Sequence, residues 1–340
     1  MGKSKKTLTD TALLLTITIL TFVVMYACAM IFLGQSFLTF NGFFDMLNNK
    51  STLLIVSCGL SIVMISGGID ISVGGVIALV GMCCAIYLKD FGGNPYTAIL
   101  IALGIGIAFG IVQGFIVAYL GIQPFIVTLA GMFFARGMTT IISSDHLNVS
   151  DVESFKKIFE AKIIIPGLGF VNNNGVYVDA FLKIGVVVSL LIVVLLFFML
   201  KYTKVGRNLY AVGGNAQSAL MLGINVTRTR FYSHLMCSTL AGIAGYIYFI
   251  TFGSGSGDNA LGYEMDAIAS SIIGGTLLTG GVGNIFGTMF GVFSLHTIQT
   301  IVASAGLGDP WWTGITRASM LCLFLVIQSV ILAVRKHAKA

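Results

Sequence analysis

Eight long apolar runs in this sequence of 340 residues constrain its fold more than any other feature. A helix needs roughly 20 apolar residues to cross a hydrocarbon core about 30 Å thick. Six runs fit one crossing each, whereas the runs at 51–88 and 265–305 are too long for one. The runs occupy residues 11–33, 51–88, 96–120, 125–142, 181–200, 231–252, 265–305 and 314–334. We therefore predict an all-α polytopic membrane protein, one transmembrane domain over 1–340 with about ten transmembrane helices.

Composition supports this prediction and removes several classes of function. The chain is 56% hydrophobic and 9% charged, with a mean hydropathy of +0.97, whereas a globular domain is roughly a quarter charged. No room is left for a soluble enzyme domain. The cations behind the net charge of +6 cluster at segment ends, where they set topology, so we expect no nucleic acid partner. The four histidines lack ligand-like spacing, so we expect no metal site.

A basic interruption at residues 201–230 separates the runs into two groups. It carries five Lys and Arg and no carboxylate, and cytoplasmic loops prefer such cations, so we place it in the cytoplasm. Ten crossings then put both basic termini on the same side. The run at 11–33 is expected as an uncleaved first span, because about 23 residues is too long for the core of a signal peptide. A cleavage site at Ala27-Cys28-Ala29 is the alternative.

Two glycine-rich stretches interrupt the longest apolar runs. The first surrounds the carboxylate of Asp70, and a similar pattern recurs in the second. Their glycines are Gly67, Gly68, Gly74, Gly75, Gly274, Gly275, Gly280 and Gly281. Irregular backbone at membrane depth survives only when it is buried in protein or lines a wet cavity. We therefore predict two related halves, 51–142 and 231–334, each containing a broken helix of two short pieces.

Five polar residues within the apolar runs are candidates for a translocation path: Asp70, Ser72, Gln113, Thr128 and Arg136. Each has a structural alternative. Asp70 and Ser72 suit a helix cap at the inner interface. Gln113 and Thr128 suit hydrogen bonds between helices. Arg136 suits a side chain that extends to the membrane surface.

The polar segment 143–179 is placed outside the cell by the count of crossings. It holds four acids and three lysines before residue 163, and it offers a surface on which a soluble partner could dock. A solvated lid is the alternative.

A short surface helix is expected within the basic interruption. Asn215 can cap a helix that starts near Ala216, and Gly223 can end it. Ala216, Ala219 and Leu220 would give this helix a small apolar face suited to a groove in another protein. A loop helix without a partner is the alternative.

A nucleotide-binding loop of the form G-x-x-x-x-G-K-[ST] does not occur in the sequence, so any ATP that drives transport must bind to a partner. We expect no cofactor on this chain, with ATP and magnesium held by partner subunits. Two rival functions remain at this point: a secondary transporter or channel driven by an ion gradient, and an enzyme embedded in the membrane.

Specific motifs resemble the permeases of ribose- and galactofuranose-type ABC importers over nearly the whole chain. The family's G-G-I-D-[IL]-S-V-G stands at 67–74, and its G-R-x-x-Y-A-[IV]-G-G-N stands at 206–215. Three further segments look closest to the galactofuranose branch: T-L-A-G-M-F-F-x-R-G at 128–137, I-G-G-T-L-L-x-G-G-V-G at 273–283, and W-W-T at 311–313.

The resemblance implies an ATP-driven importer of a monosaccharide in a bacterial inner membrane, with both termini cytoplasmic. This chain would form a heterodimer with a second permease of related sequence. The complex would also contain two ATP-binding subunits and an extracytoplasmic sugar-binding protein. A furanose, ribose or fructose is the expected substrate class. The basic interruption would carry the helix that couples transport to the ATPase, with the residues Gly206, Arg207, Tyr210, Gly213, Gly214, Asn215, Ala219 and Gly223. Many relatives have Glu-Ala-Ala followed by Arg after this motif, where this chain has Gln217-Ser218-Ala219-Leu220.

Overall fold

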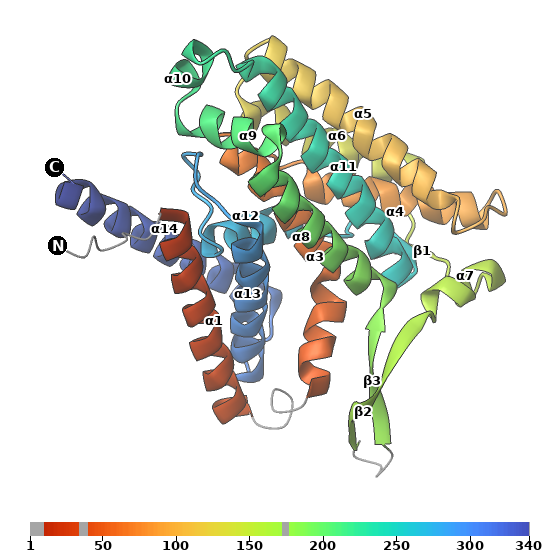
Figure 1. Ribbon diagram of the computed structural model, residues 1–340. Coiled ribbons are helices and arrows are strands. Elements are labelled where there is room, and N and C mark those ends of the chain that lie inside the picture. Colours follow the sequence, from red (N-terminus) through yellow and green to blue (C-terminus); the bar gives the residue numbers. More distant parts are fainter. Residues whose placement is uncertain (1–9, 34–39, 172–176, 340) are drawn as a thin grey trace.

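A computed structural model describes residues 10–33, 40–171 and 177–339. The part of the chain that it describes is a bundle of helices with two small pairs of strands (Figure 1). The helices are α1 Asp10–Leu33, α3 Phe40–Ile65, α4 Val73–Lys89, α5 Ala98–Tyr119, α6 Pro124–Ile142, α7 Glu153–Phe159, α8 Ile184–Tyr202, α9 Lys204–Gly214, α10 Ala216–Met221, α11 Val226–Phe252, α12 Tyr263–Ile273, α13 Ile285–Ser304 and α14 Pro310–Lys339. The strands are β1 Leu147–Asn148, β2 Lys162–Val171, β3 Tyr177–Lys183 and β4 Ser254–Gly255.

Eight helices in the described residues are long and apolar enough to cross a membrane. They are α1, α3, α5, α6, α8, α11, α13 and α14. The ten expected segments are completed by two shorter helices beside the glycine-rich breaks, α4 with 17 residues and α12 with 11. Since a helix rises 1.5 Å per residue, α12 is too short to cross alone. The predicted polytopic helical fold is confirmed.

The bundle is organised around α3 and α11. The most apolar window of α3 is 89% buried, and that of α11 is 67% buried, whereas the outer helices α1, α6 and α14 bury 22% or less. α11 packs against α3, α4 and α5. Its close approach to α5 follows from three glycines spaced four residues apart, Gly106, Gly110 and Gly114. A Cβ atom on Gly110 would lie 2.8 Å from Leu235 Cα, so only small residues on this stripe permit the contact.

The first broken helix differs from the expected two short pieces. α3 begins at Phe40, eleven residues before the apolar run at Ser51, and is a full crossing of 26 residues. Its polar first turns are stabilised by distant partners: Asn48 Nδ2 donates to the Phe181 carbonyl at 2.9 Å, and Lys183 N–H donates to Asn48 Oδ1 at 2.8 Å. In the second half the order of lengths is reversed, because the short α12 precedes the long α13.

The segment 143–179 is more structured than a simple loop. α7 packs Phe155 on Phe249 near the end of α11, with ring centroids 5.1 Å apart. β2 and β3 form an antiparallel hairpin that pairs Lys162 with Lys183. Because β3 continues to Lys183, the next span starts at Ile184 rather than at Phe181. The hairpin and α10 lie at opposite ends of the molecule (Figure 1).

Candidate functional site

The two glycine-rich breaks lie against each other at one end of the bundle. The first follows α3 at residues 66–72, and the second joins α12 to α13 at residues 274–284. The backbone N–H of Gly281 donates to the carbonyl oxygen of Ile65 at 2.9 Å. A Cβ atom on Gly280 would lie 2.9 Å from Gly67 Cα. The breaks that the sequence placed in separate halves therefore form one joint.

Four of the eight predicted break glycines take the left-handed backbone that favours glycine. These are Gly67, Gly275, Gly280 and Gly281, with φ between +73° and +87°. Gly68 is also in the break, and Gly274 ends α12.

Gly74 and Gly75 correct the prediction, because they lie in the first turn of α4 and not in the break. Their role is close packing: a Cβ atom on Gly75 would lie 2.8 Å from the Met132 carbonyl oxygen of α6.

The helix α9 docks on this joint through Gly213. A Cβ atom on Gly213 would collide with the Ile65 carbonyl oxygen and would lie 2.6 Å from Gly281 N. The Tyr210 hydroxyl donates to the Gly283 carbonyl at 2.9 Å, and burial raises the pKa of Tyr210 to about 12. One helix of the basic interruption thus touches both breaks.

The short helix α10 forms as the sequence predicts. The Asn215 side chain accepts the Ser218 N–H at 2.9 Å, and Gly223, at φ +78°, ends the helix. The Ile224 N–H donates a hydrogen bond to the Ala219 carbonyl at 3.0 Å, which caps the carboxyl end of α10. On α9, Gly206 donates its N–H to the Thr203 hydroxyl at 3.3 Å, and the exposed Arg207 donates to the Tyr202 carbonyl at 3.3 Å.

The apolar surface of α10 is only partly the one expected. Ala219 is only 2% exposed and packs inward, whereas Leu220, Met221 and Leu222 are 56%, 80% and 79% exposed. We call these three residues the apolar tip. Large apolar side chains exposed together outside the spans indicate a contact surface.

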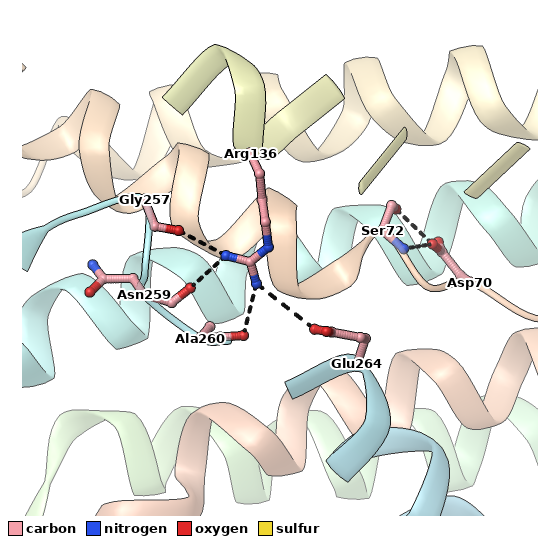
Figure 2. Close-up of polar contacts among 7 residues, drawn as sticks. All are labelled: Asp70, Ser72, Arg136, Gly257, Asn259, Ala260 and Glu264. Carbon is pink, nitrogen blue, oxygen red and sulfur yellow. Dashed lines mark hydrogen bonds and ion pairs between the residues drawn. The ribbon is translucent and has the colours of Figure 1, made fainter. Parts of the chain in front are cut away.

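Asp70 is the centre of a buried polar cluster beside the first break. Its Oδ1 accepts the Ser72 N–H at 3.0 Å and the Ser72 hydroxyl at 2.6 Å, and its Oδ2 accepts the Ser238 hydroxyl at 3.3 Å (Figure 2 shows Asp70 and Ser72). The Ser72 hydroxyl also lies 3.2 Å from Gln113 Oε1. Asp70 and Ser72 are fully buried, and Ser72 is the N-cap residue of α4, although its side chain makes no capping hydrogen bond.

The other two predicted path residues form hydrogen bonds outside this cluster. The hydroxyl of Thr128 donates to the Pro124 carbonyl of its own helix at 2.8 Å. Arg136 points from α6 into the loop before α12 (Figure 2), where it donates to the carbonyls of Gly257, Asn259 and Ala260 and lies 4.0 Å from Glu264. Arg136 therefore anchors the loop before α12.

Sequence reasoning missed a group of hydroxyls that joins the two halves. Ser61 Oγ lies 2.9 Å from Ser271 Oγ and 2.7 Å from Thr288 Oγ1, and Ser271 donates to the Ser57 carbonyl at 3.2 Å. Ser57 and Ser61 lie four residues apart on α3, and this spacing was the available signal.

Sequence reasoning also missed a charged pair that holds α12. Asp266 pairs with Arg317 of α14 and accepts a hydrogen bond from Gln299 of α13 at 3.2 Å.

These features define a multi-pass membrane protein of the permease class, with two broken helices joined at one end and an exposed helical unit docked on the joint. The family model described as "Branched-chain amino acid transport system / permease component" matches residues 42–326. The chain belongs to this family, whose relatives include permease subunits of ABC transporters.

Three relatives show how far this similarity extends. The chain is 37% identical over 284 residues to the inner membrane ABC transporter permease protein YjfF of Escherichia coli (strain K12), covering 84% of this chain and 82% of that protein. It is 33% identical over 282 residues to the fructose import permease protein FruG of Bifidobacterium longum (strain NCC 2705), covering 83% and 81%. It is 31% identical over 303 residues to the ribose import permease protein RbsC of Escherichia coli (strain K12), covering 87% and 88%. No solved structure matches the chain.

Proposed function

We propose that this chain is the permease subunit of an ATP-driven importer and forms part of the path of a monosaccharide. One observation carries the coupling part of this proposal: α9 and α10 connect an exposed apolar tip to both broken helices. Gly213 touches the two breaks, and Leu222 lies nine residues further along the same unit. A push on the tip would reach both halves of the permease through rigid contacts.

The partner of the apolar tip is proposed to be an ATP-binding subunit. An exposed short helix with large apolar side chains suits a groove in another protein. This helix has no Glu or Arg of its own, so we expect affinity to come from apolar burial rather than charge pairing. The neighbouring Arg207 and Arg228 are exposed and would supply electrostatic attraction at the rim.

The proposed substrate is a monosaccharide, since fructose and ribose appear in the names of two relatives. The motifs of the galactofuranose branch favour a furanose. Asp70, Ser72 and Gln113 offer charged and polar groups that could bind its hydroxyls, and a second permease would complete the path. We keep Thr128 and Arg136 as supports of this path rather than as contacts.

The proposed orientation places the apolar tip in the cytoplasm of a bacterium and the β2–β3 hairpin outside its inner membrane. The basic residues of 201–230 support this orientation. The first turn of α1 and the last turn of α14 both lie toward the α9–α10 end in Figure 1, which agrees with cytoplasmic termini. The hairpin would then face an extracytoplasmic sugar-binding protein.

Purification with the products of neighbouring genes tests this function. The chain is expressed with these products in mild detergent, and the complex is assayed for ATPase activity and for import of ribose, fructose and galactose into proteoliposomes. We expect an ATPase and a second permease to co-purify with the chain. When residues 216–222 are scrambled, we expect the ATPase to be lost, either alone or together with the second permease. Import that follows an ion gradient and continues without any ATPase would contradict the proposal.

A further inference from the structure

A cavity of about 210 Å³ lies at the end of the bundle that carries α9. Three elements enclose it: the α3–α4 break, the turn between α5 and α6, and the first turns of α11. Its polar lining comes from Ser66, Gln123, Arg230 and His234. At ~30 Å³ per water, this is space for about seven waters, which is on the scale of one sugar ring.

Two of the lining side chains have unused hydrogen-bonding capacity. His234 is 1% exposed, and its Nδ1 has no hydrogen-bond partner in the described part of the chain. Arg230 forms no ion pair with any acid among the same residues. Leaving a buried ring nitrogen without a hydrogen bond is unfavourable, so a ligand or water that satisfies it is expected.

The cavity and the Asp70 cluster border the same face of α11. Arg230, His234 and Ser238 are spaced four residues apart, so they lie on the same face of the helix. Ser238 donates to Asp70 Oδ2 at 3.3 Å. The Ser66 hydroxyl donates to Ser233 Oγ at 3.0 Å, which ties the first break to α11 beside the cavity.

We propose that this cavity is an inner binding site for the transported monosaccharide, occupied after the sugar passes Asp70 and before its release. This assignment rests on the function proposed above. In this lining, Arg230 can only donate hydrogen bonds, whereas Ser66, Gln123 and His234 can both donate and accept them. Hydroxyl groups also donate and accept, so a neutral sugar can satisfy such a lining. An anion only accepts, so it would leave the accepting atoms of this lining without a donor.

Protection of an introduced thiol tests the site. Gln123→Cys places a thiol in an exposed turn at the cavity. Leu120→Cys, 59% exposed on the same turn but outside the cavity lining, is the matched control. Both are made with Cys28→Ala and Cys322→Ala, which remove the two exposed native thiols of the described chain. The full complex is labelled with a maleimide in detergent, with ribose, fructose, galactose or inorganic phosphate added.

We expect the imported sugar to slow labelling at residue 123 about fivefold at four times its Kd, from the occupancy factor 1 + [L]/Kd, and to leave residue 120 unchanged. His234→Ala should abolish this protection without changing the rate of labelling in the absence of sugar. If a sugar that the complex imports does not slow labelling at residue 123, the inner site is overturned and the proposed function stays intact. Slower labelling at residue 123 with phosphate, and not with the sugar, would overturn the sugar site in favour of an anion site. A complex that imports none of these sugars would overturn both proposals.

Discussion

The backbone N–H of Gly281 donates to the carbonyl oxygen of Ile65 at 2.9 Å, which joins the two broken helices of the chain directly. These residues lie more than 200 positions apart in the sequence. Gly213 of α9 packs into the same contact. The joint therefore gives one short helical unit access to both halves.

The apolar tip should determine binding of the ATP-binding subunit. Met221→Asp and Leu222→Asp would force a charge into a buried contact, so we expect at least about tenfold weaker association, or about 1.4 kcal/mol. Met221→Leu keeps the apolar character and serves as the control. The measurement is the affinity of the detergent-purified permease for its ATPase. Equal affinities in the three variants would show that the tip does not form the contact.

Asp70 should be needed for transport beyond its contribution to stability. Asp70→Ala removes the acceptor of the Ser72 and Ser238 hydroxyls, and each unsatisfied buried group costs about 1–3 kcal/mol. Asp70→Asn keeps one oxygen for Ser72, so we expect a smaller loss in melting temperature but a similar loss of import. Thermal melting and proteoliposome import are compared. If import falls only in proportion to stability, Asp70 has a structural role alone.

Tyr210 should make the α9 contact sensitive to high pH. Its folded pKa of about 12 lies above the ordinary value of about 10, so the neutral hydroxyl is favoured in the folded state. The associated stability is present below pH 10 and is lost as pH rises toward 12. Tyr210→Phe also loses the hydrogen bond to Gly283, worth about 1 kcal/mol.

We expect the melting temperatures of the parent protein and of Tyr210→Phe to differ at pH 8 and to converge above pH 10. A constant difference across this range would contradict the assignment of the pKa to the docked hydroxyl.

Arg136 should hold the loop before α12 in place. Arg136→Met removes its hydrogen bonds to three carbonyls, and bonds of charged groups contribute about 1.5–3 kcal/mol each. Amide exchange at residues 256–261 should therefore become at least about tenfold faster, with Arg136→Lys intermediate. Exchange in α3 serves as the internal control. Unchanged exchange in this loop would show that the arginine is not its anchor.

Local patterns in the sequence predicted much of this fold. The apolar runs gave α1, α5 and α6 to within two residues at each end, because a crossing helix is recorded in consecutive residues. The cap at Asn215 and the stop at Gly223 were also predictable, since capping uses neighbours along the chain.

Features that depend on distant partners were not predictable. α3 starts early because Asn48 bonds to residues 181 and 183 of the hairpin. The loop contacts of Arg136 were not predicted, because its carbonyl partners lie more than 120 residues away in the sequence. Leu220 was predicted as part of the exposed apolar face, but Ala219 is buried and Met221 and Leu222 are exposed, because the sequence did not show which face of α10 meets α9.

We expect α9 to transmit movement to both breaks through Gly213. Gly213→Ala places a methyl group against Ile65 and Gly281, and overpacking of this kind typically costs about 1–3 kcal/mol. Gly214→Ala is the matched control, since a Cβ atom on Gly214 would meet nothing within 4 Å. Both substitutions add one methyl group to adjacent residues of the same helix.

The most direct test is the number of sugar molecules imported per ATP hydrolysed, measured in proteoliposomes that contain the full complex. We predict that Gly213→Ala lowers this ratio severalfold while ATP hydrolysis continues, and that Gly214→Ala keeps the parent ratio. The same ratio in the parent and in both variants would contradict the account.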